Sequence, residues 1–175
     1  MKRSLLGLTL VLAASAMLAS PAMAQVSASD NIQVTGTVAG PLSVAGGNDL
    51  VFGVIIPGLA RTILPSDPGA GTFLVSGQSG AGVQLTFPGL PTVISNGTPA
   101  DDIPLTLSLV YNTANVPTGG TTINPAVTLN PTTALSTDAT GVLYIFLGGT
   151  VTPAGAQTPG GYTNTFTLSA AYVNN

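Results

Sequence analysis

Two neighbouring carboxylates, Asp101 and Asp102, are the side chains of this sequence best placed to do chemistry together. A pair of carboxylates can divide acid and base roles, or it can share a divalent cation. Neighbouring side chains on a strand point to opposite faces, so these two could share an ion only from a loop. Calcium would also need several further oxygen ligands. Asp101 and Asp102 are thus the candidate metal ligands, and the competing interpretation, which the sequence favours, is a solvated turn before Ile103-Pro104.

The other side chains that enzymes commonly use are missing. The sequence contains no His and no Cys, and all six of its acidic residues are Asp. Ser and Thr are abundant, but no His accompanies them, and the one Lys, at position 2, belongs to the leader described below, so nothing would activate them as nucleophiles. The Gly-rich stretches lack the Lys and the following helix of a phosphate loop. We therefore predict a protein that is not an enzyme and uses no cofactor.

The first 24 residues have the pattern of a secretory signal peptide. A positively charged start at Lys2 and Arg3 precedes a short apolar run over residues 5–18, and Ala22-Met23-Ala24 forms an A-x-A cleavage site. We predict a signal peptide at residues 1–24 and an exported protein of the periplasm, the cell surface or the extracellular space. No other long apolar segment follows, so we expect no membrane insertion of residues 25–175.

The charge of residues 25–175 limits the partners of the protein. One base, Arg61, stands against six Asp, which gives this part of the chain a net charge of −5. Nucleic-acid binding needs a patch of Lys and Arg, and electrostatic attachment to anionic lipid needs the same. The sequence therefore excludes both classes of partner.

Alternation of apolar and polar residues predicts that residues 25–175 form a single all-β domain. β-branched residues are frequent, Gly and Pro interrupt the chain regularly, and no helical pattern follows residue 24. About seven to nine short strands are typical of an antiparallel β-sandwich or barrel. We expect residues 141–151 to be the central strand and residues 31–44 to break near Gly40-Pro41. The expected strands are residues 31–44, 50–56, 71–76, 83–87, 92–95, 105–111, 126–129, 141–151 and 162–172.

The last of these segments alternates almost to the end of the chain. Large residues fall on one parity, and hydroxylated residues fall between them. This pattern predicts a strand with one buried face and one solvated face. The residues expected toward the core are Tyr162, Phe166, Leu168, Ala170 and Tyr172.

Three short stretches stand out together: residues 49–53 (DLVFG), residues 148–150 (GGT), and residues 161–168 (GYTNTFTL) followed by Tyr172. They resemble the D-L-x-F-G, G-G-T-L and G-x-Y-x-x-T-F-x-L motifs of a family of secreted bacterial domains of unknown function. That family is similar in plan to spore coat protein U domains and to chaperone–usher pilins. The resemblance implies an immunoglobulin-like, pilin-like sandwich that a neighbour completes with a strand. The chain lacks the cysteines common in many of those pilins.

The resemblance also implies roles for both ends of the domain. In such pilins a C-terminal strand is handled by a periplasmic chaperone, and an N-terminal arm is donated to the next subunit. The matching C-terminal positions are Gly161, Phe166, Leu168 and Tyr172. The candidate positions of the donated arm are Val26, Ala28, Ile32 and Val34.

Two functions remain open from the sequence. The first is a structural or cell-surface subunit, fimbria-like or coat-like, that self-associates by β-strand complementation with or without a chaperone. The second is a self-complete monomeric sandwich that binds a ligand or partner at its loops. The pairing of the first strand distinguishes them, because residues 32–38 could instead be the first strand of their own domain.

Overall fold

The computed structural model describes residues 29–36, 38–125 and 130–173, and its contacts divide the chain into two units, Met1–Thr37 and Val38–Asn175. Regular structure in the described residues consists of ten β-strands and a short 3₁₀ helix, η2 (Pro99–Asp101), without any α-helix. The predicted all-β class is confirmed. The strands are β1 (Ser43–Gly46), β2 (Arg61–Ile63), β3 (Gly71–Ser76), β4 (Gly82–Thr86), β5 (Val93–Ile94), β6 (Ile103–Asn112), β7 (Thr121–Ile123), β8 (Thr132–Ala134), β9 (Val142–Val151) and β10 (Ser169–Tyr172).

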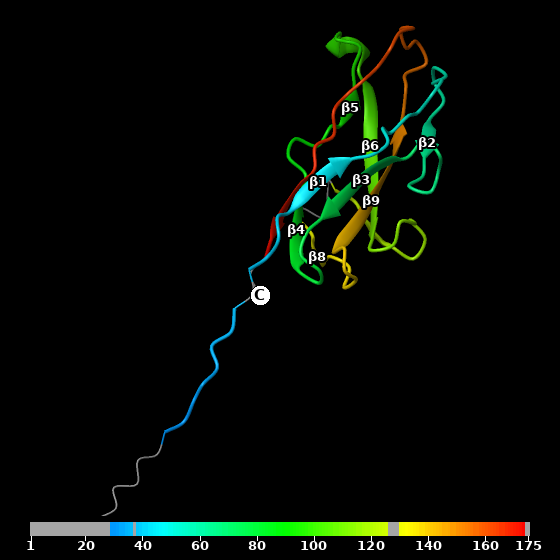
Figure 1. Cartoon of the computed structure of the whole chain (residues 1–175). Helices are drawn as coiled ribbons and strands as arrows, with labels where there is room; N and C mark the ends of the chain where they lie inside the picture. Colours follow the sequence, from blue (N-terminus) through cyan, green and yellow to red (C-terminus); the bar gives the residue numbers. More distant parts are fainter. Residues whose placement is uncertain (1–28, 37, 126–129, 174–175) are drawn as a thin grey trace, which may run out of the picture. The chain divides into compact units, whose positions relative to one another are not determined.

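The larger sheet has the order β1-β3-β9-β6-β5, and every pairing in it is antiparallel (Figure 1). β9 is central, as predicted, because β6 runs along one of its edges while β3 and then β2 share the other. β7 pairs with β6 over Leu109–Ile123, Val110–Thr122 and Tyr111–Thr121.

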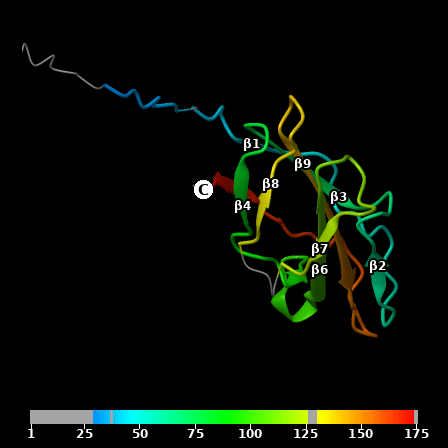
Figure 2. The same ribbon diagram turned by 90° about the horizontal axis from the view of Figure 1, so that it is seen from below.

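The smaller sheet has the order β10-β4-β8 and is also antiparallel. Figure 2 shows β4 and β8 in a layer separate from β3, β9 and β6. Leu85 from β4 and Leu143 from β9 have no exposed surface, and they belong to one hydrophobic cluster. Two antiparallel sheets with their apolar faces joined in one core form a β-sandwich. The immunoglobulin-like strand topology stays a prediction.

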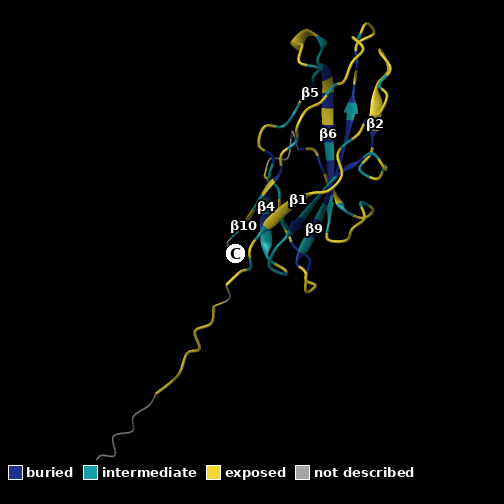
Figure 3. Cartoon of the chain, turned by 45° about the horizontal axis from the view of Figure 1, so that its top comes forward, coloured by how far each residue is buried: buried dark blue, intermediate teal, exposed yellow. Residues whose placement is uncertain are grey.

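Burial follows the expected alternation in the longer strands. In β6, buried Ile103, Leu105 and Leu107 alternate with exposed Pro104 and Thr106, and Figure 3 shows the alternating colours along this strand. A period of two puts these three apolar side chains on one face of the sheet. That face is the floor of the site described below.

The first predicted strand, residues 31–44, is wrong over most of its length. Within the described residues only Ser43 and Val44 of that range belong to a strand, β1. Ile32 and Val34 are 90% and 93% exposed, although their alternation resembles that of a buried strand. Pro41, just before β1, has no amide hydrogen to extend a ladder. A period-two pattern thus shows which side chains can share an apolar face, and it does not supply the partner strand.

Other differences have local causes. Residues 50–56 are not a strand, because the chain turns at Gly53, where φ is 67°. Only residues 169–172 of the predicted closing strand pair as one. β2, β7 and β8 were missed because three residues are too few to show a period. Residues 126–129 lie outside the described residues.

The turn at Asn96-Gly97 is followed by η2 before β6 begins, so it does not form a two-residue hairpin. Within the described residues, no helix has the length and hydrophobicity needed to cross a bilayer.

Candidate functional site: an apolar groove along one side of the sandwich

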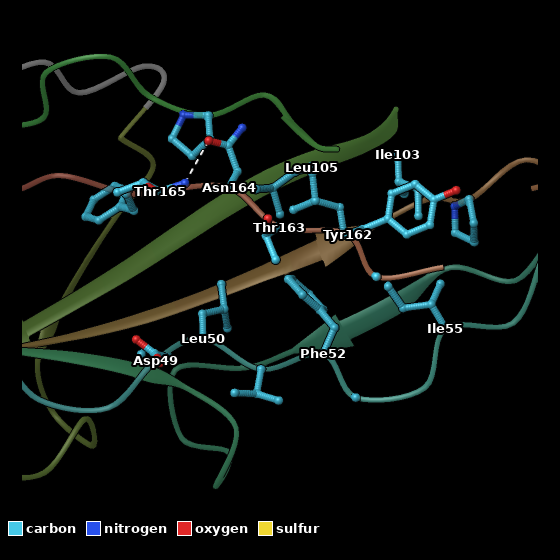
Figure 4. A pocket seen from close by; sticks show the side chains of 18 of the residues that line it. Asp49, Leu50, Phe52, Ile55, Ile103, Leu105, Tyr162, Thr163, Asn164 and Thr165 are labelled. Carbon is cyan, nitrogen blue, oxygen red and sulfur yellow. Dashed lines mark hydrogen bonds between the residues drawn. The ribbon is translucent and has the colours of Figure 1, made fainter. Parts of the chain in front are cut away.

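A groove opens between two segments that are far apart in the sequence. One wall is residues 48–55, the other is residues 157–166, and the volume of the space is about 980 Å³. Figure 4 shows Leu50 and Phe52 projecting from the first wall into the space beside Tyr162 and Thr163 of the second. We call this space the lateral groove.

The floor of the lateral groove is the core-facing side of the larger sheet. β6 contributes Ile103, Leu105 and Leu107, and the neighbouring strand β9 contributes Leu147. All four side chains are less than 10% exposed. The floor of the groove is therefore part of the hydrophobic core.

The first wall continues the edge of the larger sheet beyond β1. The amide of Gly47 donates to the carbonyl of Thr72, and the amide of Val51 donates to that of Gly69, both at 2.8 Å. At Gly53 the chain adopts a left-handed conformation that residues with a Cβ rarely tolerate. This turn ends the edge pairing and brings Ile55 back against the core.

The second wall is held at its middle by β5 and the residue that follows it. Thr163 and Ser95 exchange two backbone hydrogen bonds, with N–O distances of 2.9 and 3.0 Å. The side-chain amide of Asn164 donates to the carbonyl of Val93 at 2.8 Å. These contacts fix the height of the wall above the floor.

Beyond this point the second wall has no partner strand, because β4 ends at Thr86 and Pro88 cannot donate to a ladder. Phe166 nevertheless packs inward. Its ring centroid lies 5.7 Å from that of Phe73 and 5.8 Å from that of Phe87. Aromatic pairs at these separations are favourable beyond the area that they bury.

A polar network closes one end of the groove around the hydroxyl of Tyr162. This hydroxyl accepts hydrogen bonds from the side-chain amides of Asn96 at 3.3 Å and Gln157 at 3.0 Å, and it donates to the carbonyl of Thr158 at 2.7 Å. The Gln157 amide also donates to the carbonyl of Asp101. The aromatic ring thus lines the groove, while hydrogen bonds satisfy its hydroxyl at the closed end.

Both walls present backbone amides without a strand partner. Among the described residues, the amides of residues 52–55 donate no hydrogen bond, and neither do those of Phe166 and Thr167. β10, which continues the second wall, is an edge strand of its sheet. An apolar floor between open backbone edges has the chemistry that an added β-strand requires.

The four C-terminal candidate residues lie along this wall and its continuation. Gly161 and Phe166 line the groove. Leu168 is buried in the core, and Tyr172 packs against the core from β10. The predicted parity is confirmed, because Tyr162 and Ala170 also pack inward while the hydroxylated residues between them are exposed.

The four N-terminal candidate residues divide differently. Ile32 and Val34 are exposed and belong to no strand. Val26 and Ala28 lie outside the described residues. No strand of the described structure pairs with Ile32 or Val34. The assembly role of all four residues therefore stays a prediction.

The acidic pair, Asp101 and Asp102, directly precedes β6. Asp101 lies in η2, and Asp102 follows it with one carboxylate oxygen, Oδ1, buried and without a hydrogen-bond partner in the described structure. No group of three or more potential ligands occurs in the described part of the chain.

The pKa of Asp138 is lowered, and the cause of the shift is structural. Hydrogen bonds from the hydroxyls of Ser136 and Thr140, both at 2.7 Å, lower the pKa of Asp138 to about 2, with help from the amides of Thr140 and Gly141. These bonds hold the turn between β8 and β9.

The first wall is the part of the groove that sequence analysis did not identify. A strand was expected over residues 50–56, either buried on both faces or bent at Gly53 at a sheet edge, whereas Leu50, Phe52 and Ile55 line the groove. The D-L-x-F-G stretch was the available signal.

Comparison with known proteins adds no relative: no family model matches the chain, and neither does any curated protein or solved structure. The resemblance to secreted and pilin-like domains therefore stays a prediction from the short motifs.

Proposed function

We propose that the protein is a structural subunit of an exported, fimbria-like or coat-like assembly, in which a β-strand of one copy fills the lateral groove of the next. The observation that carries the proposal is the apolar floor between two walls with open backbone edges. A strand inserted there would gain main-chain hydrogen bonds from the walls and apolar burial from the floor. The proposed role is non-catalytic.

The occupant that we propose is residues 31–38 of a second copy. Ile32, Val34 and Val38 share one parity and are each at least 90% exposed, so they have apolar surface to bury. Gln33 and Thr35, between them, would face solvent. This segment and the first wall both have eight residues, and eight residues span about 26 Å when extended.

A periplasmic chaperone that lends a strand to the same groove before assembly would fit this proposal. Such a chaperone would protect the apolar floor until a second copy replaces it. Contacts of this kind need no charged side chains on the subunit, which agrees with a groove whose one charged lining residue is Asp49.

The test is the oligomeric state of residues 25–175 across a wide concentration range, measured by light scattering after size-exclusion chromatography. We expect oligomers that grow with concentration and that an excess of a synthetic peptide spanning residues 29–38 converts to monomers. A peptide with Asp at positions 32 and 34 is the matched control and should have no effect. A protein that is monomeric throughout and does not bind the peptide would contradict the proposal.

The volume of the groove also favours a second function, that of a monomeric sandwich binding a small ligand. Ligand sites commonly measure about 300–1,000 Å³ and combine an apolar lining with a few polar groups. The side-chain amides of Asn48 and Asn164 line the groove and could supply such polar groups. A monomer that binds an apolar fluorescent dye with one-to-one stoichiometry, and from which the peptide does not displace the dye, would favour this function.

A further inference from the structure

The hydroxyl of Tyr172 joins three segments that are distant in the sequence. It accepts a hydrogen bond from the amide of Gln78 at 2.7 Å and donates one to the carbonyl of Gly40 at 3.0 Å. The side-chain oxygen of Gln78 in turn accepts a bond from the amide of Gly40 at 3.4 Å. Both backbone polar groups of Gly40 are thus engaged.

Space for this hydroxyl is provided by a glycine. A Cβ on Gly77 would lie 2.4 Å from the Tyr172 hydroxyl and 2.9 Å from the side chain of Leu42. Atoms cannot approach so closely, so a side chain at position 77 would displace the hydroxyl. The hydrogen bonds of the Tyr172 hydroxyl therefore depend on a glycine at position 77.

Gly40 is also where the chain changes from exposed to packed. Val38 is 94% exposed, whereas Leu42 packs against the core and β1 begins at Ser43. The Tyr172 hydroxyl therefore holds the last anchored residue before the segment that we propose is donated.

We infer that Tyr172 is a positioning residue for assembly, an inference that rests on the proposed function. Its hydroxyl fixes Gly40 in the free subunit, so donation of residues 31–38 orders fewer residues. Without the hydroxyl, residues 38–41 gain freedom in the free subunit and lose it on assembly, which weakens association.

Tyr172→Phe tests this inference in residues 25–175, because the ring stays and only the hydroxyl is lost. Ordering the backbone of about one further residue on assembly costs about 1–2 kcal/mol, so self-association should weaken about tenfold. A labelled peptide spanning residues 29–38 is not attached to Gly40. It should therefore bind the groove of the variant as tightly as that of the wild type, at concentrations where both are monomers.

Tyr144→Phe is the matched control, since no hydrogen bond of its hydroxyl occurs in the described structure, and it should change neither measurement. Gln78→Ala, which removes the acceptor for the Gly40 amide, is the second variant and should weaken self-association alone. If peptide binding falls together with assembly, Tyr172 acts through the fold and the inference is wrong. If Tyr172→Phe assembles normally and still binds the peptide, the inference fails while the proposed function stands. If the wild type does not bind the peptide, both fail.

Discussion

The double substitution Ile32→Ala and Val34→Ala gives the most direct measure of strand donation. Both side chains are at least 90% exposed in the free chain, so their truncation should leave the free energy of unfolding within about 0.5 kcal/mol of the wild type. In an assembled strand the same side chains would lie against the floor formed by Leu105 and Leu107. The substitution therefore separates folding from association.

The expected size of the effect follows from the carbon atoms removed. The two substitutions delete five methyl or methylene carbons, and burial of each contributes about 0.8 kcal/mol, so association should weaken by about 4 kcal/mol if burial is complete. Each 1.4 kcal/mol is a factor of ten, which makes the upper limit roughly 500-fold to 1,000-fold in the dissociation constant. Incomplete burial would reduce it, and we expect a loss of at least about 30-fold.

Sedimentation velocity over a concentration series measures this loss, and thermal unfolding at low concentration checks the fold. Thr35→Ala is the matched control, because Thr35 has the opposite parity in the same segment and should change neither measurement appreciably. If the double variant associates with the wild-type concentration dependence, residues 31–38 are not the donated strand. An equal loss from Thr35→Ala would show that the face of the strand, and hence the groove, has been assigned wrongly.

Three further substitutions test the fold itself. Leu109→Ala should lower the free energy of unfolding by about 2–5 kcal/mol in chemical denaturation, because Leu109 has no exposed surface and leaves a cavity between the sheets. Gly77→Ala should cost about 1–3 kcal/mol in the same assay, because its Cβ would overlap the Tyr172 hydroxyl. Asp138→Asn removes a carboxylate whose pKa is lowered from 3.8 to about 2. The stability that this carboxylate contributes is complete above about pH 4 and is lost as the pH falls toward 2. The difference in melting temperature between wild type and Asp138→Asn should therefore be constant from pH 5 to 7 and shrink between pH 4 and 2, and a difference that grows in acid would contradict the assignment.

Local sequence signals predicted some strands closely and others only in part. The boundaries of β3 were predicted correctly, because glycines at positions 71 and 77 mark the two ends of its short apolar run. In the sheet this strand lies between β1 and β9, so it is paired along both edges. The segment 162–172 has the correct parity but pairs as a strand only from Ser169. Alternation records which side chains face the core, whereas pairing depends on where β4 ends, and Pro88 decides that from a distant part of the sequence.

The lateral groove could not be predicted either, because it depends on how distant parts of the chain are placed side by side. Its walls, residues 48–55 and 157–166, are separated by about a hundred residues, and neither is a strand. The sequence does not show that the turn at Gly53 leaves a groove between this segment and residues 157–166. That consequence depends on the order of strands in the two sheets, to which no local pattern corresponds.

The charge composition of the chain agrees with self-association through backbone hydrogen bonds and apolar surface. From residue 25 onward the chain has one base and six acids, so two copies repel each other weakly and have almost no opposite charges with which to attract. Main-chain hydrogen bonds and apolar burial are insensitive to net charge, and an open edge supplies the first while the groove floor supplies the second. Ile32, Val34 and Val38 are apolar and exposed, as the proposed occupant of the groove requires. An exposed apolar segment carries an aggregation liability, and under the proposed function that liability is removed when the segment of one copy occupies the groove of another.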